Sequence, residues 1–236
     1  MDNKIQKLAE IIKNSNYVVF FTGAGASTES GLQDFRGRNG LYNEREFMGY
    51  EPEEILSHEF FYAHRDIFDK YLVEKLAIND IKPNAGHIAV ADLEKMGKVK
   101  AVITQNIDNL HQDGGSKNVL ELHGTLKRWY CLGCGKIYDH SCKCSCGGNV
   151  RPDVTLYGEM LNEDVTEAAI KEIERADTLI IVGTSLTVYP AAYYLNYFRG
   201  KHLIIINETP TSQDGAAELV IRTGFAKTME EVMQLI

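Results

Sequence analysis

The sequence predicts an α/β fold, built as a parallel β-sheet with helices on both faces. Short and almost wholly apolar runs alternate along the chain with longer segments whose apolar residues recur every three or four positions. The short runs have the pattern of strands buried on both faces, and the longer segments have that of amphipathic helices. The 236 residues suffice for one such domain with a small appendage, but not for two domains of typical size.

The first half of the chain shows this alternation clearly. Apolar residues recur at helical spacing over 4–14, and an apolar run at 17–21 predicts a buried strand that leads into a glycine loop. Residues 38–80 are rich in aromatic side chains and have a helical pattern. We expect a helix over 82–97, which has a proline at its start and a glycine at its end, and a buried strand over 99–106.

The second half resumes the alternation after a stretch of about residues 126–151 that contains every cysteine. The expected elements are a helix over 163–177, a strand over 178–186, a short helix after Pro190, strands over 202–207 and 219–224, and a C-terminal helix. Helix–strand alternation of this kind is typical of a parallel sheet covered on both faces.

Composition and charge narrow the classes of function. The formal net charge of −8 disfavours a general affinity for nucleic acid phosphates and is compatible with lysine-rich polypeptide partners. No run of about 20 apolar residues is present, so we expect neither a membrane span nor a membrane partner. The polar stretch Met1–Glu10 does not look like a secretory signal, and we therefore expect a cytoplasmic protein.

The five cysteines form one cluster. Without an export signal, metal ligation is a better interpretation than disulfides, and four thiolates from two short knuckles suit a tetrahedral zinc ion. Cys131 and Cys134 have the standard spacing of the first knuckle. Cys142, Cys144 and Cys146 compete for the two places of the second. A closed site of this kind leaves no coordination place for water, which indicates a structural role.

The glycine loop "TGAGAST" follows the first predicted strand. Gly23 and Gly25 permit a tight turn and a close approach to a diphosphate, whose charge suits the amides of a helix start. Thr28 occupies the place of the third glycine of a dinucleotide fingerprint, and no clear acidic residue follows about 20 positions later. The loop therefore predicts a Rossmann-like nucleotide site that is not an ordinary dehydrogenase site.

The residues that continue this loop, "GAGASTESGLQDFRG" (23–37), resemble the sirtuin family of NAD-dependent protein lysine deacylases. Five further stretches match the family in its own order and span most of the chain. They are "TQNIDNLH" (104–111), "ELHGT" (121–125), "RPDVTLYGE" (151–159), "GTSL" (183–186) and "IINET" (205–209).

The resemblance implies one domain over 1–236, with a Rossmann-like large part, a helical insertion and a small zinc-binding module. We expect the large part to comprise 1–37, 82–126 and 152–236. The small part would comprise the helical insertion 38–81 and the zinc module 127–151.

The resemblance also implies roles around the predicted sheet edge. His123 would be the general base, since an imidazole with a pKa of ~6.5 can accept a proton from a ribose hydroxyl at neutral pH. Asn106 would orient a catalytic water or ribose hydroxyls, and Gln105 would face the NAD ribose. Ile107 and Asp108 would bind the nicotinamide carboxamide, which needs both a donor and an acceptor.

Further cofactor contacts follow from the same matches. Phe35 would shield the ribose carbon from water after nicotinamide leaves, and Arg36 would contact phosphate or position the loop. The remaining expected contacts are Ala24 and Thr28 in the glycine loop, Gly183, Thr184, Ser185 and Asn207 around the diphosphate and adenosine ribose, and Ala226 at the adenine.

The implied reaction couples deacylation to NAD consumption. The amide oxygen of an acyl-lysine attacks the ribose carbon that bears nicotinamide, and His123 then activates a ribose hydroxyl that captures the acyl carbon. The segment 154–159 would pair with the substrate backbone. The expected partners are proteins or peptides that contain acetyl-lysine, and no direct nucleic acid contact is expected. The alternatives are a mono-ADP-ribosyltransferase, a non-catalytic NAD or ADP-ribose sensor, and a zinc ribbon; the charge disfavours the ribbon, and the intact His123 motif disfavours the sensor.

Acyl preference and the last zinc ligand also depend on the resemblance. Family members specific for succinyl or malonyl groups carry a Tyr-x-x-Arg pair, which Tyr62 and Arg65 match. The surrounding sequence aligns better with a deacetylase pattern that moves the acyl-pocket positions to about Asp69 and Leu72, so we favour deacetylation. The "CGG" before "RP" selects Cys146 as the last zinc ligand, and its partner is Cys144 or, with a longer loop, Cys142. We favour Cys144, so the expected ligand set is Cys131, Cys134, Cys144 and Cys146.

Overall fold

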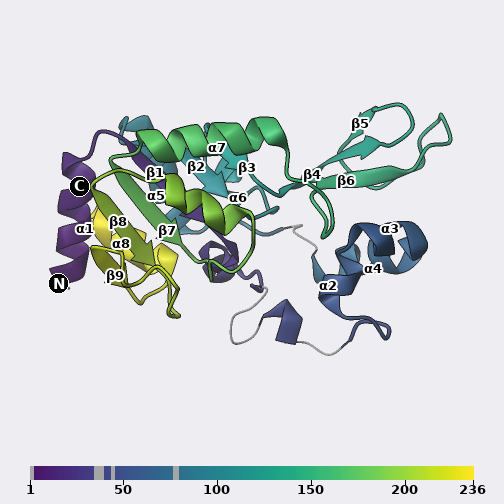
Figure 1. Cartoon of the computed structure of the whole chain (residues 1–236), viewed down its shortest axis with the longest axis horizontal. Coiled ribbons are helices and arrows are strands. Elements are labelled where there is room, and N and C mark those ends of the chain that lie inside the picture. The colour runs from purple at the N-terminus through teal and green to yellow at the C-terminus, as the bar shows by residue number, and fades with distance from the viewer. Residues whose placement is uncertain (1–2, 35–39, 44–45, 77–79) are drawn as a thin grey trace.

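A six-stranded parallel sheet forms the centre of the large part of the protein (Figure 1). The computed structural model describes residues 3–34, 40–43, 46–76 and 80–236. The strands are β1 (Val18–Thr22), β2 (Val99–Thr104), β3 (Val119–Glu121), β7 (Thr178–Val182), β8 (His202–Ile206) and β9 (Leu219–Ile221). Their order is β3-β2-β1-β7-β8-β9. The chain adds strands outward on one side of β1 and then, from β7 on, outward on the other side, so a crevice is expected between β1 and β7 at the carboxyl ends of the strands. The predicted parallel α/β sheet is confirmed.

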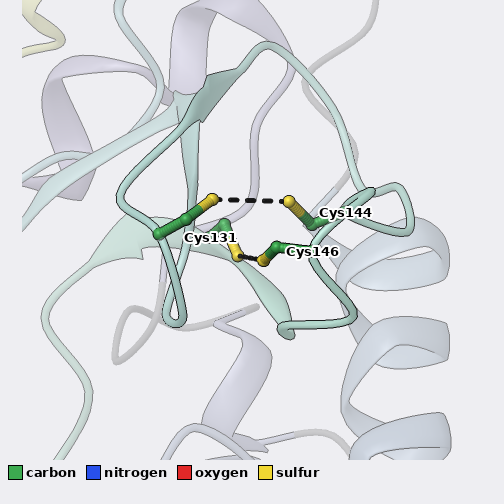
Figure 2. Close-up of side chains that lie close together, drawn as sticks. Cys131, Cys144 and Cys146 are labelled. Atoms are coloured by element: carbon green, nitrogen blue, oxygen red, sulfur yellow. Dashed lines mark hydrogen bonds between the residues drawn. The ribbon is translucent and has the colours of Figure 1, made fainter.

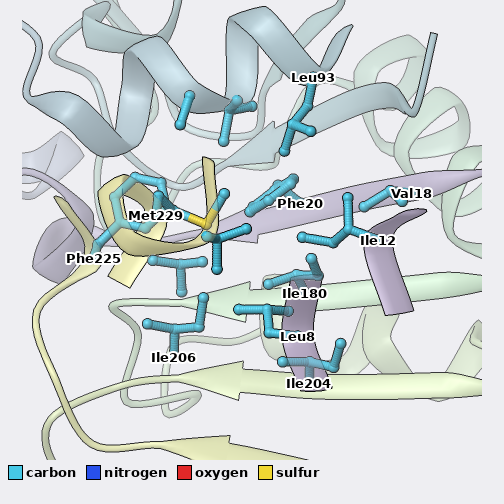
Figure 3. Close-up of a cluster of buried hydrophobic side chains, with 14 of the residues drawn as sticks. Leu8, Ile12, Val18, Phe20, Leu93, Ile180, Ile204, Ile206, Phe225 and Met229 are labelled. Atoms are coloured by element: carbon cyan, nitrogen blue, oxygen red, sulfur yellow. The ribbon is translucent and has the colours of Figure 1, made fainter. Parts of the chain in front are cut away.

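Helices cover both faces of this sheet, as the apolar runs predict. On one face lie α1 (Asn3–Asn14), α5 (Ala85–Lys95) and α8 (Phe225–Met233), and on the other lie α7 (Glu163–Arg175) and the 3₁₀ helix η4 (Ala191–Tyr197). Successive strand residues serve opposite faces: Phe20 packs with the first group, as Figure 3 shows, and Phe21 with the second. Every residue of β1 and β7 is buried, which explains their unbroken apolar sequence.

A second sheet and a group of short helices lie together at one end of the molecule, away from both termini (Figure 1). The antiparallel strands are β4 (Gly124–Cys131), β5 (Ile137–Tyr138) and β6 (Val150–Val154), in the order β5-β4-β6. The helices are α2 (Pro52–Ile55), α3 (His58–Ala63) and α4 (Arg65–Lys75). They share one apolar cluster with the small sheet, in which Phe61, Phe68 and Trp129 are buried.

Several elements differ from the sequence-based expectations. The helical segment expected over 38–80 consists, in its described residues, of η3 (Leu41–Asn43) and α2–α4. The glycine loop runs into two 3₁₀ turns, η1 (Ala24–Ala26) and η2 (Thr28–Ser30), rather than the expected helix start. The four-residue helix α6 (Leu110–Asp113) and the sheet of β4–β6 were not expected. Both β4 and β6 cross the expected limits of the zinc module, and the division into parts stays a prediction.

Among the described residues, no helix combines the length and the hydrophobicity needed to cross a lipid bilayer.

Candidate active site and cysteine cluster

A cleft of about 580 Å³ opens at the carboxyl edge of the large sheet. Its volume is within the range of pockets that hold small-molecule ligands. The loops that follow β1, β2, β3, β7 and β8 all contribute to it. The predicted site residues that line it are Ala24, Thr28, Gln105, Asn106, Ile107, His123, Gly183, Thr184, Ser185 and Asn207.

The glycines at this edge allow two loops to pack backbone against backbone. The Gly25 amide donates to the Gly183 carbonyl at 2.8 Å. A Cβ on Gly183 would lie 2.2 Å from the Ala26 amide nitrogen, and the φ of Gly183 is +59°, in the left-handed region. The glycine pattern that suggested a diphosphate loop therefore also has a structural cause, the contact between the β1 and β7 loops.

His123 lies at the junction of the two sheets, between β3 and β4. The next residue, Gly124, has a φ of +76°, and a Cβ there would lie 1.9 Å from the Asp153 carbonyl oxygen. Only glycine lets the chain turn here from the parallel sheet into the pairing of β4 with β6.

The ring of His123 is oriented by one hydrogen bond. Its Nδ1 lies 2.8 Å from the Gln105 carbonyl oxygen, and since a carbonyl only accepts, Nδ1 carries the hydrogen. Burial lowers the pKa of His123 below its usual value, against the hydrogen bond to Gln105, which raises it. The imidazole is thus neutral at pH 7, with the lone pair of Nε2 available to accept a proton.

Asn106 and Asp108 belong to one buried hydrogen-bond network centred on Ser27. Asn106 Nδ2 donates to Ser27 Oγ at 3.1 Å, and Ser27 Oγ donates to Asp108 Oδ2 at 2.7 Å. The Leu110 amide donates to Asp108 Oδ1 at 2.9 Å. Burial raises the pKa of Asp108, and these hydrogen bonds oppose the rise. Ser27 was missed in the sequence analysis, although it stands in the matched glycine-loop stretch.

Asp108 lines a smaller cavity of about 60 Å³ rather than the main cleft. Asn106 and Ile107 line both cavities, so the two are neighbours. A carboxylate oxygen and backbone groups at this position can provide the acceptor and donors that a carboxamide requires.

The β7 loop is linked to the β2 loop across the cleft floor. Gln105 Nε2 donates to Thr184 Oγ1 at 3.1 Å. Asn207 is buried after β8, and its Nδ2 donates to the Thr209 carbonyl at 2.8 Å. The adjacent Glu208 also lines the cleft and was not singled out from the sequence.

Of the remaining expected cofactor contacts, two cannot be placed and one does not line the main cleft. Phe35 and Arg36 lie outside the described residues. Ala226 does not line the cleft, although the preceding residue Phe225 does. The Ala226 amide donates to Glu29 Oε2 at 2.6 Å.

The segment 154–159 lines the cleft and is held in place from both sides. The Thr155 amide donates to the His123 carbonyl at 2.9 Å, and the Tyr157 amide donates to the Leu56 carbonyl at 3.0 Å. The hydroxyls of Tyr157 and Tyr42 are 2.8 Å apart. The regular strand β6 ends at Val154. Beyond it, one edge of the segment's backbone pairs with the helical insertion, through the isolated bridge between Tyr157 and Ser57.

A buried ion pair fixes the shape of this segment. Arg151, which is 4% exposed, donates from Nη1 and Nη2 to the two carboxylate oxygens of Glu159 at 2.5 and 2.9 Å. The Leu156 amide donates to Glu159 Oε2 at 2.9 Å. Burial alone would raise the pKa of Glu159, but the hydrogen bonds from Arg151 and its neighbours lower it to about 2. Neither residue of this pair was proposed from the sequence as a site residue.

Tyr62 and Arg65 do not form a receptor for an acyl carboxylate. Arg65 Nε donates to Asp69 Oδ1 at 2.8 Å, and Arg65 Nη2 donates to the Val150 carbonyl at 2.6 Å. The guanidinium also lies over the Phe61 ring, 4.7 Å from its centroid. Neither Tyr62 nor Arg65 lines the cleft, and neither do Asp69 and Leu72, the expected acyl-pocket positions.

Four cysteine sulfurs converge in the small sheet (Figure 2). The Sγ atoms of Cys131, Cys134, Cys144 and Cys146 all lie within 4.8 Å of one another. The Cys131–Cys146 sulfur distance is 3.5 Å and the Cys134–Cys144 distance is 3.6 Å. A tetrahedral zinc ion with Zn–S bonds of ~2.3 Å holds its sulfurs about 3.8 Å apart. The set therefore fits zinc, and Cys142 is not part of it.

The backbone around the cysteines supports the same interpretation. The Gly133 amide donates to Cys131 Sγ at 3.4 Å, and the Gly148 amide donates to Cys146 Sγ at 3.3 Å. Cys131 and Cys144 are also buried in the cluster shared with the helical insertion. A metal ion here would connect the two cysteine-bearing loops of the small sheet, which pack against the insertion, and would take no part in the chemistry at His123.

Comparison with known sequences places the whole chain in one family. The model of the Sir2 family matches residues 23–190. A protein of Fusobacterium nucleatum named NAD-dependent protein deacetylase is 61% identical over 233 residues, covering 99% of this chain and 92% of that protein. A Clostridium perfringens protein of the same name is 52% identical over 243 residues, covering 99% and 100%.

Solved structures give the same result. A structure described as Sir2 with a p53 peptide and NAD⁺ matches with a TM-score of 0.87 at 34% identity, covering 98% of each chain. Another contains Sir2 with a deacetylated p53 peptide and 3′-O-acetyl ADP ribose, and matches with a TM-score of 0.89 at 35% identity, again over 98% of each chain.

Proposed function

The chain belongs to the Sir2 family, and we propose that it is an NAD-dependent protein lysine deacetylase in which His123 is the general base. The observation that carries this proposal is the hydrogen bond from His123 Nδ1 to the Gln105 carbonyl, which leaves Nε2 free to accept a proton inside the cleft. The lowered pKa keeps this nitrogen unprotonated at neutral pH.

The residues of the cleft fit NAD as a co-substrate. When bound, NAD would supply an electrophilic ribose carbon with nicotinamide as the leaving group, and an ADP-ribose part that accepts the acetyl group. Asp108 and the Ile107 backbone would hold the carboxamide, because they combine acceptors and donors in a buried place. Asn106, oriented by Ser27, would position ribose hydroxyls or water. Gly183, Thr184, Ser185 and Asn207 would surround the diphosphate and the adenosine ribose.

The acetyl-lysine peptide would lie along segment 154–159. The ion pair of Arg151 and Glu159 holds this segment beside His123, where an acetyl-lysine side chain can enter the cleft. We propose that acetyl is preferred over succinyl or malonyl, since Arg65 is engaged with Asp69 and Val150 and does not line the cleft. We further propose a cytoplasmic location, as the polar stretch Met1–Glu10 suggests, and, on the support of the net charge of −8, no direct nucleic acid partner.

The cysteine cluster could hold one structural zinc ion. Its four thiolates would complete a closed tetrahedral shell, and the ion would stabilise the small sheet without taking part in the reaction.

The test of this function is a deacetylation assay with an acetyl-lysine peptide, with and without NAD. The wild-type protein is expected to release deacetylated peptide and nicotinamide in equal amounts, only when NAD is present. His123→Ala should lose about 10²–10⁴-fold in rate. His140→Ala, a change at an exposed histidine in the loop between β5 and β6, serves as the control and should keep the wild-type rate. If the NAD is labelled in its ADP-ribose part, transfer of the label to protein without deacetylated peptide would instead indicate ADP-ribosyl transfer. NAD binding without turnover would indicate a sensor.

A further inference from the structure

Two buried histidines that the proposed reaction does not use lie behind the cleft. His87 on α5 is 0% exposed and His111 on α6 is 2% exposed. Their ring centroids are 4.7 Å apart, and the rings meet edge to face. A buried imidazole without a carboxylate partner is costly unless its two nitrogens are satisfied.

The hydrogen bonds of each ring define its tautomer. The Asn84 amide donates to His87 Nδ1 at 3.3 Å, so the hydrogen of His87 is on Nε2. His111 Nε2 lies 3.1 Å from Thr22 Oγ1, whose own hydrogen goes to Thr104 Oγ1 at 2.9 Å. Thr22 therefore accepts, His111 Nε2 carries the hydrogen, and His111 Nδ1 is an acceptor.

The two remaining nitrogens are complementary. His87 Nε2, a donor, and His111 Nδ1, an acceptor, are both fully buried and have no hydrogen-bond partner among the described residues. They belong to the same close pair of rings. A donor and an acceptor on two neighbouring rings of this kind are chemically able to satisfy each other, either directly or through one enclosed water.

The pair lies between two loops of the active-site cleft. On the His87 side, Asn84 Nδ2 donates to the Ala26 carbonyl at 2.9 Å, in the glycine loop. On the His111 side, Thr104 Oγ1, which accepts from Thr22, also accepts from the Asn106 amide at 3.1 Å. One run of polar contacts thus joins the glycine loop to His87, and a second joins His111 to Asn106, with the two neighbouring histidine rings between them.

We propose that His87 and His111 are positioning residues for NAD, which hold the glycine loop and the Asn106 loop at the separation that the cofactor requires. The inference rests on the proposed function, because the two loops are those assigned to NAD. The segment assigned to the peptide, residues 154–159, is held instead by hydrogen bonds to His123, Leu56 and Arg151. Loss of the pair should therefore weaken NAD binding and leave peptide binding nearly unchanged.

The test compares His87→Phe, His111→Phe and the double variant. Each single change leaves one buried polar nitrogen without its complement, whereas the double change removes both and keeps two rings in the space. We expect all three variants to raise the KM for NAD about three- to tenfold, with the peptide KM within about twofold of wild type. We expect the double variant to regain most of the stability that the single variants lose, while its KM for NAD stays raised.

The control is Leu93→Ala, which removes a fully buried side chain from the same helix α5 without touching either run of polar contacts. It should lower stability and leave both KM values unchanged. The inference is overturned if the double variant has the wild-type KM for NAD, or if Leu93→Ala raises that KM as much. NAD affinity is also measured by calorimetry without peptide. If the wild-type protein binds NAD but does not deacetylate, the proposed function is refuted, and the NAD affinities of the variants still test this inference.

Discussion

The pH dependence of stability should reveal the buried histidine pair without any activity measurement. Burial lowers the pKa of His87 from 6.5 to about 4. Between these two values the unfolded chain binds a proton that the folded chain does not, so stability falls as the pH falls through this window. Above pH 6.5 both states are neutral at this residue and the penalty is absent.

The size of the effect follows from that difference in pKa. At pH 5 the lower pKa of His87 in the folded state reduces the free energy of unfolding by about 2 kcal/mol, and near pH 4 by about 3 kcal/mol. The pKa of His111 is lowered too, by burial and by the proximity of His87, which acts in the same direction. Glu159, whose pKa is lowered from 4.5 to about 2, loses its stabilising contribution as the pH falls below about 4.5, so it adds little at pH 5 and begins to add to the loss near pH 4.

Urea unfolding of wild type and His87→Phe at pH 8 and pH 5 measures this contribution. The wild-type protein should lose about 2 kcal/mol more between the two pH values than the variant does, because only wild type has the histidine to charge. Loss of zinc from the cysteine cluster at pH 5 affects both proteins and cancels in the difference. Leu93→Ala should keep the full wild-type pH dependence. Equal losses in wild type and His87→Phe would refute the reasoning.

Three further predictions concern the site itself. Glu159→Gln removes the carboxylate that holds Arg151 and should raise the peptide KM about tenfold in steady-state kinetics, with the KM for NAD unchanged; an equal rise in both would contradict the role in the peptide segment. Cys144→Ser should abolish zinc in the purified protein by mass spectrometry of metals, and Cys142→Ser should retain one ion per chain; the reverse result would move the ligand assignment to Cys142. The deacetylation rate should fall with decreasing pH with a midpoint below pH 6.5, because burial lowers the pKa of His123 and the base must be neutral; a midpoint above pH 7 would exclude this assignment.

The sequence was informative where burial is complete. Strands such as β1 and β7 are wholly buried, so their apolar runs stand out in the sequence, and the loops that follow them were assigned correctly to the sheet edge. The small sheet was not visible in the same way. Its strand β4 mixes buried, half-buried and exposed positions, with the consecutive Lys127 and Arg128 both exposed, and β5 has only two residues. Neither produces an apolar run.

Site residues that act through tertiary contacts were also beyond the sequence. Ser27 was not distinguished from its neighbours, because its role depends on Asp108, which is 81 positions away in the chain. Glu159 acquires its role from Arg151 and from the turn that brings its carboxylate back to the Leu156 amide. The choice of Cys144 over Cys142, by contrast, was favoured from the sequence, and the path of the loop agrees with it by bringing Cys144 Sγ to 3.6 Å from Cys134 Sγ.

The most direct test of the account is a comparison of two reactions of His123→Ala in one assay, with acetyl-lysine peptide, NAD and labelled nicotinamide. If His123 is the base that acts after nicotinamide has left, the variant should still exchange labelled nicotinamide into NAD in the presence of the peptide, while deacetylation is reduced at least about 10²-fold. Retention of wild-type deacetylation by a folded His123→Ala protein, or equal loss of exchange and deacetylation with NAD binding intact, would contradict the assignment of His123.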